Sequence, residues 1–231
     1  MSSYNVPDLA SGEIHREEEV IRRSRFIVSI ARVQGPEQAK AFIDRIRAEH
    51  SDATHNCWAF QAGPAGSTAF AGCSDDGEPK GTAGRPMLTV LLHCGVGEIA
   101  AVVTRYFGGV LLGAGGLTRA YAKSAKDALD AAGKARMRLW SAVTVDCPYP
   151  MLERLKLLAA AHGSTVEGTD FGAAVSVRIL LPQENAAGFD AALTELSAGT
   201  MTTRCVYIYG PAQINSSSLP SIVRQLQRQS T

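Results

Sequence analysis

The sequence predicts an α+β protein of two domains, on three observations. The chain has 231 residues, of which 45% are hydrophobic and 19% are charged, a balance typical of globular proteins. Short β-branched runs alternate with segments of helical spacing. The second half follows the order strand, helix, strand, strand, helix, strand within about 70 residues, which is the ferredoxin-like motif. We therefore expect domains over residues 1–138 and 139–210, followed by a flexible tail over 211–231.

The first domain opens with extended chain and one helix. Residues 14–33 are predicted to be extended, because Arg25–Val33 is rich in β-branched side chains. Pro36 is predicted to open a helix, since proline at the first helical position loses no donor that the helix needs. Four apolar residues at helical spacing form the predicted buried stripe of this helix: Ala39, Phe42, Ile43 and Ile46.

The remaining elements of both domains follow from short apolar runs and from the turn residues between them. In the first domain they are strands over 55–63 and 67–73, a loop over 74–86, a buried helix over 87–94 that opens at Thr82 or Ala83, a strand over 98–107 and a helix over 117–132. Gly133 is predicted to end that last helix. In the second domain they are strands over 142–148, 164–172, 173–182 and 201–210, and helices over 150–163 and 183–199.

Bulk properties narrow the classes of function. The formal net charge is +1, so binding to RNA must come from a local basic patch rather than from overall charge. No apolar run approaches the roughly 20 residues needed to span a bilayer, and the polar N-terminus does not resemble a secretory signal. The five cysteines are scattered and odd in number, which favours reduced thiols. We therefore expect a cytoplasmic protein that has no membrane partner.

A glycine-rich segment joins a predicted strand to a predicted helix, with five glycines within nine residues. Glycines let backbone N–H groups converge, and a helix N-terminus adds unpaired donors and partial positive charge. With Arg105 at the strand end and Arg119 in the first helical turn, we predict a cradle for a phosphate or an RNA backbone. The P-loop ending and the dinucleotide-binding spacing are both absent. The candidate anion-binding residues are Arg105, Tyr106, Gly108, Gly109, Gly113, Gly115, Gly116 and Arg119. The alternative is that the glycines only permit tight packing and the arginines pair with nearby acids.

An acidic loop over residues 74–84 carries three acids within four residues. Such acids repel one another unless they face water, a cation or arginines. A carboxylate metal site is one interpretation, but the ligand pattern of a calcium loop is missing, so pairing with Arg105 or Arg119, or a solvated turn, is favoured. We predict no metal and no cofactor. The candidate residues of this loop and its pocket are His55, Asn56, Asp75, Asp76, Glu78 and Thr82. His55 is a candidate general base or RNA-stacking group, with a core histidine as the alternative, and the cysteines are expected to be packing groups.

Three segments together resemble the IMPACT family, and the two-domain length resembles its bacterial YigZ branch. They are DATHNCWAF (52–60), SDDGEPKGTAGRPML (74–88) and VVTRYFGGVLLGAGGLTRAY (102–121), and they match the family in order and spacing. Lys80 departs from the serine that is usual there. The resemblance implies a first domain related to the second domain of a small-subunit ribosomal protein, and a second domain like the ferredoxin-type modules of elongation factor G. Eukaryotic relatives restrain a starvation kinase through an additional domain, so only a general link to translation carries over.

Three functions are consistent with these patterns. The first is a translation-linked regulatory protein that binds RNA, the ribosome or a ribosome-associated partner through the glycine-rich and arginine surface. The second is an enzyme acting on a phosphorylated small molecule or nucleotide, in which an acid of the loop works with His55. The third is an interaction module whose ferredoxin-like sheet docks a partner. We favour the first.

Overall fold

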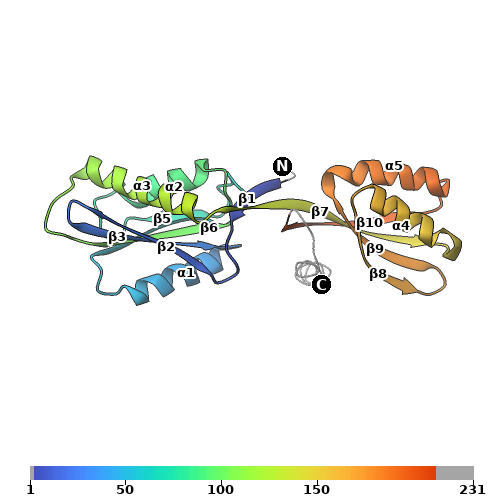
Figure 1. Ribbon diagram of the computed structural model, residues 1–231, viewed down its shortest axis with the longest axis horizontal. Coiled ribbons are helices and arrows are strands. Elements are labelled where there is room, and N and C mark those ends of the chain that lie inside the picture. Colours follow the sequence, from blue (N-terminus) through green and yellow to red (C-terminus); the bar gives the residue numbers. More distant parts are fainter. Residues whose placement is uncertain (1–2, 212–231) are drawn as a thin grey trace. The chain divides into compact units, whose positions relative to one another are not determined.

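A computed structural model of the protein describes residues 3–211. The chain forms two compact units, one over Tyr4–Ala135 and one that begins at Arg136. Each unit combines helices with an antiparallel sheet (Figure 1), so the protein has the α+β fold that the sequence predicts. No helix within the described residues is long and apolar enough to cross a membrane.

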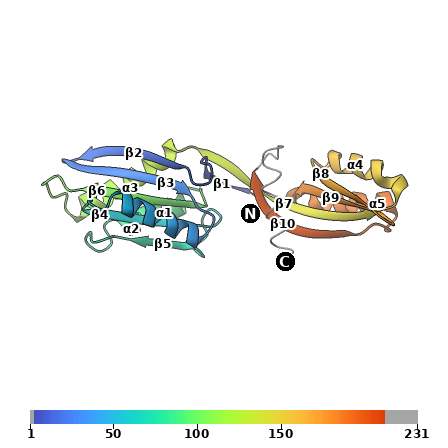
Figure 2. The same ribbon diagram turned by 90° about the horizontal axis from the view of Figure 1, so that it is seen from below.

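The N-terminal unit is built on a five-stranded antiparallel sheet in the order β2-β3-β6-β4-β5. Its elements are β1 (Ser3–Pro7), β2 (Ile14–Ile21), β3 (Ser24–Arg32), α1 (Pro36–Glu49), β4 (His55–Gln61), β5 (Ala71–Ser74), α2 (Gly84–His93), β6 (Ile99–Tyr106) and α3 (Ala114–Ala131). Figure 2 shows β2 and β5 at opposite edges of this sheet. The central strand β6 is therefore paired on both sides along its length, which suits its apolar sequence.

The sheet is covered on both faces by helices. Helices α2 and α3 lie on one face and α1 lies on the other (Figure 1). Because successive strand residues face opposite sides, Phe26 and Val28 of β3 enter the core beneath α2 and α3, whereas Ala31 enters the core beneath α1. Helix α1 buries the four residues that its helical spacing predicts. Its opposite face is polar and exposed, as expected for a helix covering one face of a sheet.

The first residues of α2 and α3 can be compared with the helix starts that the sequence predicts. Helix α2 begins at Gly84 with Ala83 as its N-cap, which confirms the predicted opening. Helix α3 begins at Ala114 rather than at the predicted Leu117, because Gly113 makes the turn with φ 72° and its carbonyl accepts the first helical bond at 2.9 Å from the N–H of Leu117. Gly115 and Gly116 are therefore the first turn of the helix and not part of a loop. Gly133, with φ 73°, follows the helix end as predicted.

The C-terminal unit has the predicted strand and helix order. Its elements are β7 (Lys134–Cys147), α4 (Leu152–Ala161), β8 (Thr165–Phe171), β9 (Val175–Pro182), α5 (Ala186–Ser197) and β10 (Thr203–Pro211), with short 3-10 turns at Tyr149–Met151 and Gln183–Asn185. The antiparallel order β10-β7-β9-β8 is that of the ferredoxin-like fold. Its core contains Leu155 and Ala159 of α4 and Phe189 and Leu193 of α5. Apart from Pro211, the predicted tail lies outside the described residues.

Candidate functional site

The acidic loop folds onto the N-terminus of α2, where Asp75 acts as a cap. Its carboxylate accepts backbone N–H bonds from Gly81, Ala83 and Gly84 at 2.8, 3.0 and 2.8 Å. The N-cap residue Ala83 has no capping oxygen, so Asp75 supplies it from nine residues before the helix starts. Partial burial acts to raise the pKa of Asp75, and the three N–H donors outweigh that effect and hold the pKa below its ordinary value. This acid therefore stabilises the loop.

Asp75→Ala is expected to destabilise the N-terminal unit by about 1–2 kcal/mol at pH 7, as loss of a helix cap does. Because the pKa of Asp75 is lower folded than unfolded, its contribution is complete above the ordinary aspartate pKa of 3.8 and is lost as the pH falls further. The difference from the natural chain should thus shrink below that pH. Urea denaturation at pH 7 and pH 3 measures it, with Asp44→Ala, an exposed acid on α1, as the matched control. An equal loss in both variants would contradict the capping role.

Glu78 is the centre of a buried polar cluster. Its Oε1 accepts a hydrogen bond from Arg105 Nη1 at 2.6 Å and another from the hydroxyl of Tyr121 at 2.8 Å. Arg105 also donates from Nη2 to the Ser24 hydroxyl at 3.1 Å. Glu78 and Arg105 are only 7% and 5% exposed, so their ion pair lies inside the protein. The acidic loop is thereby joined to β6, to α3 and to the start of β3.

The position of Arg105 corrects the predicted cradle. Its guanidinium is buried against Glu78, with its Nε unpaired in the interior, and does not reach solvent beside Arg119. Arg119 is exposed and lies in the second turn of α3, because that helix starts earlier than predicted. The alternative interpretation, that an arginine pairs with the acidic loop, holds for Arg105. It does not hold for Arg119.

His55 and Cys57 lie on β4 beside the same cluster. His55 Nδ1 is 2.8 Å from the backbone oxygen of Asp76, which makes Nδ1 the protonated nitrogen, and its Nε2 lies 3.8 Å from Glu78 Oε2. Cys57 is fully buried and donates its S–H to the backbone oxygen of Asp75. Burial raises the pKa of the Cys57 thiol to about 12, so it is protonated at neutral pH. Cys57 is a packing group, as the sequence predicts.

The other predicted residues of the acidic loop and its pocket also have internal partners. Asp76 receives a backbone N–H bond from Asn56 at 2.7 Å and an ion pair from Arg47 at 3.1 Å. Further hydrogen bonds join Asn56 to His50 and Thr104, Tyr106 to Asp52 and His50, and Thr82 to Pro79. Among the described residues, no group of three or more His, Cys, Asp or Glu is arranged to hold a metal ion. Asp76 thereby holds the acidic loop against β4 and α1, whereas the side chains of Asn56 and Tyr106 belong to β4 and β6 and bind partners outside the loop.

The glycine-rich segment packs against the turn between β2 and β3. A Cβ on Gly108 would lie 1.9 Å from the backbone oxygen of Arg23, so only glycine fits there without movement. The N–H of Gly108 donates to the Ser24 hydroxyl at 3.3 Å. Gly109 and Gly113 have φ values of 79° and 72°, which favour glycine. The glycines therefore seat the hairpin turn against the segment that leads into α3.

A pocket at this junction gathers three cations. Three elements line it: the end of β2 and its turn, the glycine-rich segment, and α3. We call it the basic pocket, and its residues are Ile21, Arg22, Leu112, Gly116, Arg119, Ala120 and Lys123. Of the predicted anion-binding residues, it therefore contains Arg119 and Gly116, and the buried Arg105 is not among its residues. Arg22 comes from the turn instead.

The charges in the basic pocket are unequally neutralised. Arg22 and Arg119 are exposed, and neither has an ion pair or a side-chain hydrogen bond with another described residue. Lys123 is paired with Glu19 at 3.1 Å and with Asp127 at 2.7 Å. Two guanidinium groups are thus left to attract an anion. The first turn of α3 lies at the same place and has no side-chain cap, so its N–H groups add to that attraction.

The sequence did not single out Arg22, Lys123 or the exposed apolar residues of the glycine-rich segment. Leu111 is 81% exposed and Phe107 is 45% exposed. The sequence predicts that Arg22 lies in a continuous extended segment, because the turn contains no glycine, asparagine or proline. A signal was available in the polar stretch Arg22-Arg23-Ser24-Arg25, which separates Ile21 from the apolar run that starts at Phe26.

These features define a two-domain α+β protein with a basic pocket at a glycine-rich segment. The family profile described as the Impact N-terminal domain matches residues 22–129, and a domain of unknown function, DUF1949, matches residues 145–200. The Escherichia coli IMPACT family member YigZ is 43% identical over 183 residues, covering 79% of this chain and 90% of the relative. The chain belongs to the IMPACT family.

Other relatives extend the comparison. An IMPACT family member of Haemophilus influenzae is 38% identical, covering 90% of this chain and 99% of the relative. Protein IMPACT-A of Xenopus tropicalis is 34% identical over 103 residues, which cover 43% of this chain and 32% of the frog protein. A crystal structure titled as that of a hypothetical protein is 40% identical, with a TM-score of 0.62, covering 89% of this chain and 98% of that one.

Proposed function

We propose that this protein is a translation-linked regulatory protein that binds RNA, on the ribosome or in a ribosome-associated complex, through the basic pocket. The observation that carries the proposal is the placement of Arg22 and Arg119 around one pocket without carboxylate partners among the described residues. Guanidinium groups suit phosphate oxygens because they donate in a planar fork. The IMPACT resemblance supplies the link to translation.

The backbone at the hairpin turn supports a binding role for its arginines. Arg22 and Arg23 have φ values of 45° and 68°, a conformation that favours glycine or asparagine. Residues held in such conformations cost about 1–3 kcal/mol each and cluster at functional sites. Both side chains are exposed, so burial does not explain why arginine stands at these positions. Anion binding accounts for the arginine at position 22, which lines the basic pocket.

The surroundings of the basic pocket favour a polymer over a free mononucleotide. The exposed Phe107 and Leu111 belong to the same glycine-rich segment as the pocket residue Leu112. The Arg105 guanidinium lies over the Phe107 ring at 5.5 Å from its centroid, and the exposed part of that ring is the surface to which we assign stacking of an unpaired base. A backbone phosphate in the pocket would leave neighbouring nucleotides to contact such residues. Single-stranded RNA is therefore the form that we expect to bind.

Arg22→Gln/Arg119→Gln is expected to weaken binding of single-stranded RNA by about 10- to 100-fold at 50 mM salt, since each lost contact is a charge-assisted hydrogen bond. The slope of log K against log salt should fall by about 1.4, because each phosphate contact on a single strand contributes about 0.7. Filter binding across a salt series measures both quantities. The unfolding midpoint should change little, since both side chains are exposed.

The matched control is Arg154→Gln, which removes an exposed cation from α4. It should leave the affinity and the salt slope close to those of the natural chain. If the double variant binds RNA as tightly as this control does, the basic pocket is not the RNA site. If the natural chain shows no RNA binding and no co-sedimentation with ribosomes even at low salt, the proposed function is wrong.

A further inference from the structure

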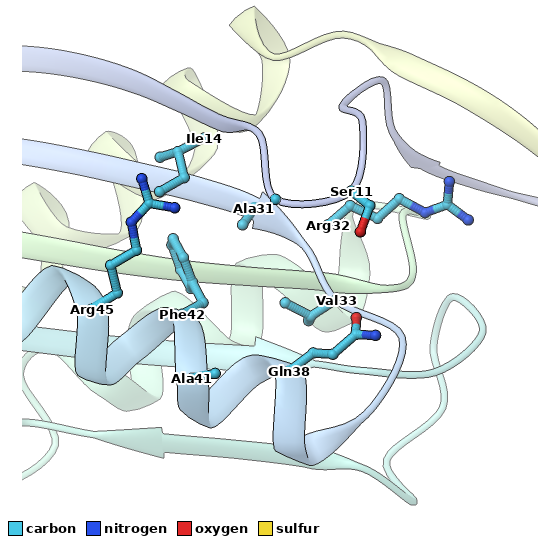
Figure 3. A pocket seen from close by; sticks show the side chains of 10 residues that line it. Ser11, Ile14, Ala31, Arg32, Val33, Gln38, Ala41, Phe42 and Arg45 are labelled. Carbon is cyan, nitrogen blue, oxygen red and sulfur yellow. The ribbon is translucent and has the colours of Figure 1, made fainter.

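A second pocket lies on the opposite side of the N-terminal unit, between α1 and the edge of the sheet (Figure 3). We call it the α1 pocket. Its volume is about 310 Å³, at the lower end of the range for small-molecule sites, which is about 300–1,000 Å³. Its apolar part is formed by Ile14 of β2, by Ala31 of β3 and Val33 just after that strand, and by Phe42 of α1.

The pocket exists because one helix covers a wide sheet face. Within residues 3–211, α1 is the only helix that packs on this side of the sheet, and β2 is the edge strand beside it. Arg16 of β2 is joined to Glu49 at the C-terminal end of α1 by an ion pair at 2.6 Å. Nothing comparable joins β2 to the earlier turns of α1 among the described residues, and the hollow lies along those turns.

Arg45 provides the charge of the α1 pocket. Figure 3 shows its guanidinium extending from α1 toward Ile14, above the ring of Phe42. Arg45 has no hydrogen bond or ion pair with another described residue. The other cation of the lining, Arg32, points away from the centre and is paired with Glu98 at 2.7 Å.

Glu49, an acid whose charge interacts with Arg45, is already engaged. The hydrogen bond from Arg16 is the main cause that lowers the pKa of Glu49, partial burial opposes it, and the charge of Arg45 contributes less. Glu49 therefore neutralises Arg16 first. Arg45 is thus the one cation of the pocket lining without a carboxylate partner among the described residues, which favours a ligand with a single negative charge. At the other end of the pocket, Gln38 accepts a bond from the backbone N–H of Gln34 at 2.9 Å, which leaves the Gln38 amide nitrogen free to donate.

We propose that the α1 pocket binds a small amphipathic carboxylic acid. The apolar part of the ligand lies on Ile14, Val33 and Phe42, and its single carboxylate pairs with Arg45. One guanidinium matches one carboxylate, and a hydrophobic floor beside a single fixed polar group is the usual arrangement of a small-molecule site. This site is separate from the basic pocket, and it does not depend on RNA binding.

Titration of the full-length chain with octanoate, followed by amide NMR shifts, tests the proposal. Saturable shifts are expected at Ile14, Val33 and Phe42, with octanol and octylamine binding at least about fivefold more weakly because neither supplies the carboxylate. Equal affinity for octanol would show that only the apolar floor matters and would overturn the proposal. Shifts confined to another surface would overturn it as well.

Three variants distinguish the contribution of the Arg45 charge to octanoate binding from that of the apolar cavity. Arg45→Gln should weaken octanoate binding about tenfold, as loss of a charge-assisted contact does. Lys40→Gln removes the same charge from an exposed position of α1 outside the pocket and should leave binding unchanged. Ala41→Trp places an indole in the opening from an exposed helix position and should abolish the shifts. If Arg45→Gln binds octanoate as the natural chain does, the pocket is not a carboxylate site.

Discussion

Arg105→Met is expected to destabilise the N-terminal unit by about 3–5 kcal/mol, because removal of one partner of a buried ion pair leaves the other charge uncompensated. Glu78 is 7% exposed, and its remaining partners are the Tyr121 hydroxyl and the more distant His55. Hydrogen-exchange protection of β6 amides against urea concentration measures the unfolding free energy of this unit separately from the other. The unfolding free energy of the N-terminal unit should fall by about 3–5 kcal/mol.

A surface ion pair of the same length provides the matched control. Arg178 Nη1 lies 2.6 Å from Asp170 Oδ2, the same separation as between Arg105 and Glu78, but both partners are exposed. Arg178→Met should therefore cost the C-terminal unit no more than about 1 kcal/mol, because solvent screens the pair. Exchange of the β9 amides measures this loss, since Arg178 lies on β9. Similar losses in both variants would show that burial does not set the cost.

A double variant tests whether the loss arises from the stranded carboxylate. Arg105→Met/Glu78→Gln removes the charge while keeping an oxygen that accepts the Tyr121 hydroxyl bond. It should be more stable than Arg105→Met alone by at least about 1 kcal/mol, since residues in contact couple with energies of that size. A double variant less stable than Arg105→Met would contradict the ion-pair explanation and point to lost packing of the arginine stem instead.

Burial of Arg105 could have been anticipated from the sequence by strand alternation. Val103 and Arg105 are two residues apart on β6 and so face the same side, and Val103 lies in the core beneath α2 and α3. A cation on that face needs an acid, and the acidic loop was the available source. The glycines that follow Arg105 instead favour a loop at the surface, which is why the sequence predicts a solvent-exposed arginine. The amphipathic stripe of α1 was predicted correctly because a period of 3.6 residues reports burial directly.

The basic pocket could not be predicted in the same way, because its parts are far apart in the sequence. Arg22 lies in the hairpin turn after β2 and Arg119 lies near the start of α3. They line the same pocket because the fold places this turn beside that helix. That turn has none of the residues that usually mark one, since Arg22 and Arg23 adopt positive φ without being glycine or asparagine. The order of strands and helices in the second domain, in contrast, was predicted correctly, because each of these elements has its own apolar pattern.

Gly108→Ala is expected to separate the hairpin turn from the glycine-rich segment and so weaken both folding and RNA binding. The new Cβ would lie 1.9 Å from the backbone oxygen and 2.1 Å from the carbonyl carbon of Arg23, so the backbone itself must move. Overpacking of this kind costs about 1–3 kcal/mol. Arg22 precedes the displaced residue and should leave its place in the basic pocket, so RNA affinity should fall, but less than in the Arg22→Gln/Arg119→Gln variant, because Arg119 remains.

Gly115→Ala is the control for Gly108→Ala. It also replaces a glycine of the same segment by alanine, but without a clash between the new Cβ and the backbone. Gly115 lies in the first turn of α3, and its added Cβ would meet only the Arg119 guanidinium at 3.7 Å, an ordinary contact. The variant should be as stable as the natural chain or more stable by up to about 1 kcal/mol, with unchanged RNA affinity, because alanine favours a helix over glycine. Urea denaturation measures stability, filter binding measures RNA affinity, and the amide shifts of residues 21–25 report movement of the hairpin turn. If the turn amides of Gly108→Ala keep their shifts and RNA affinity is unchanged, the turn does not depend on this glycine. If the amide shifts change but RNA affinity does not, Arg22 is not part of the RNA site.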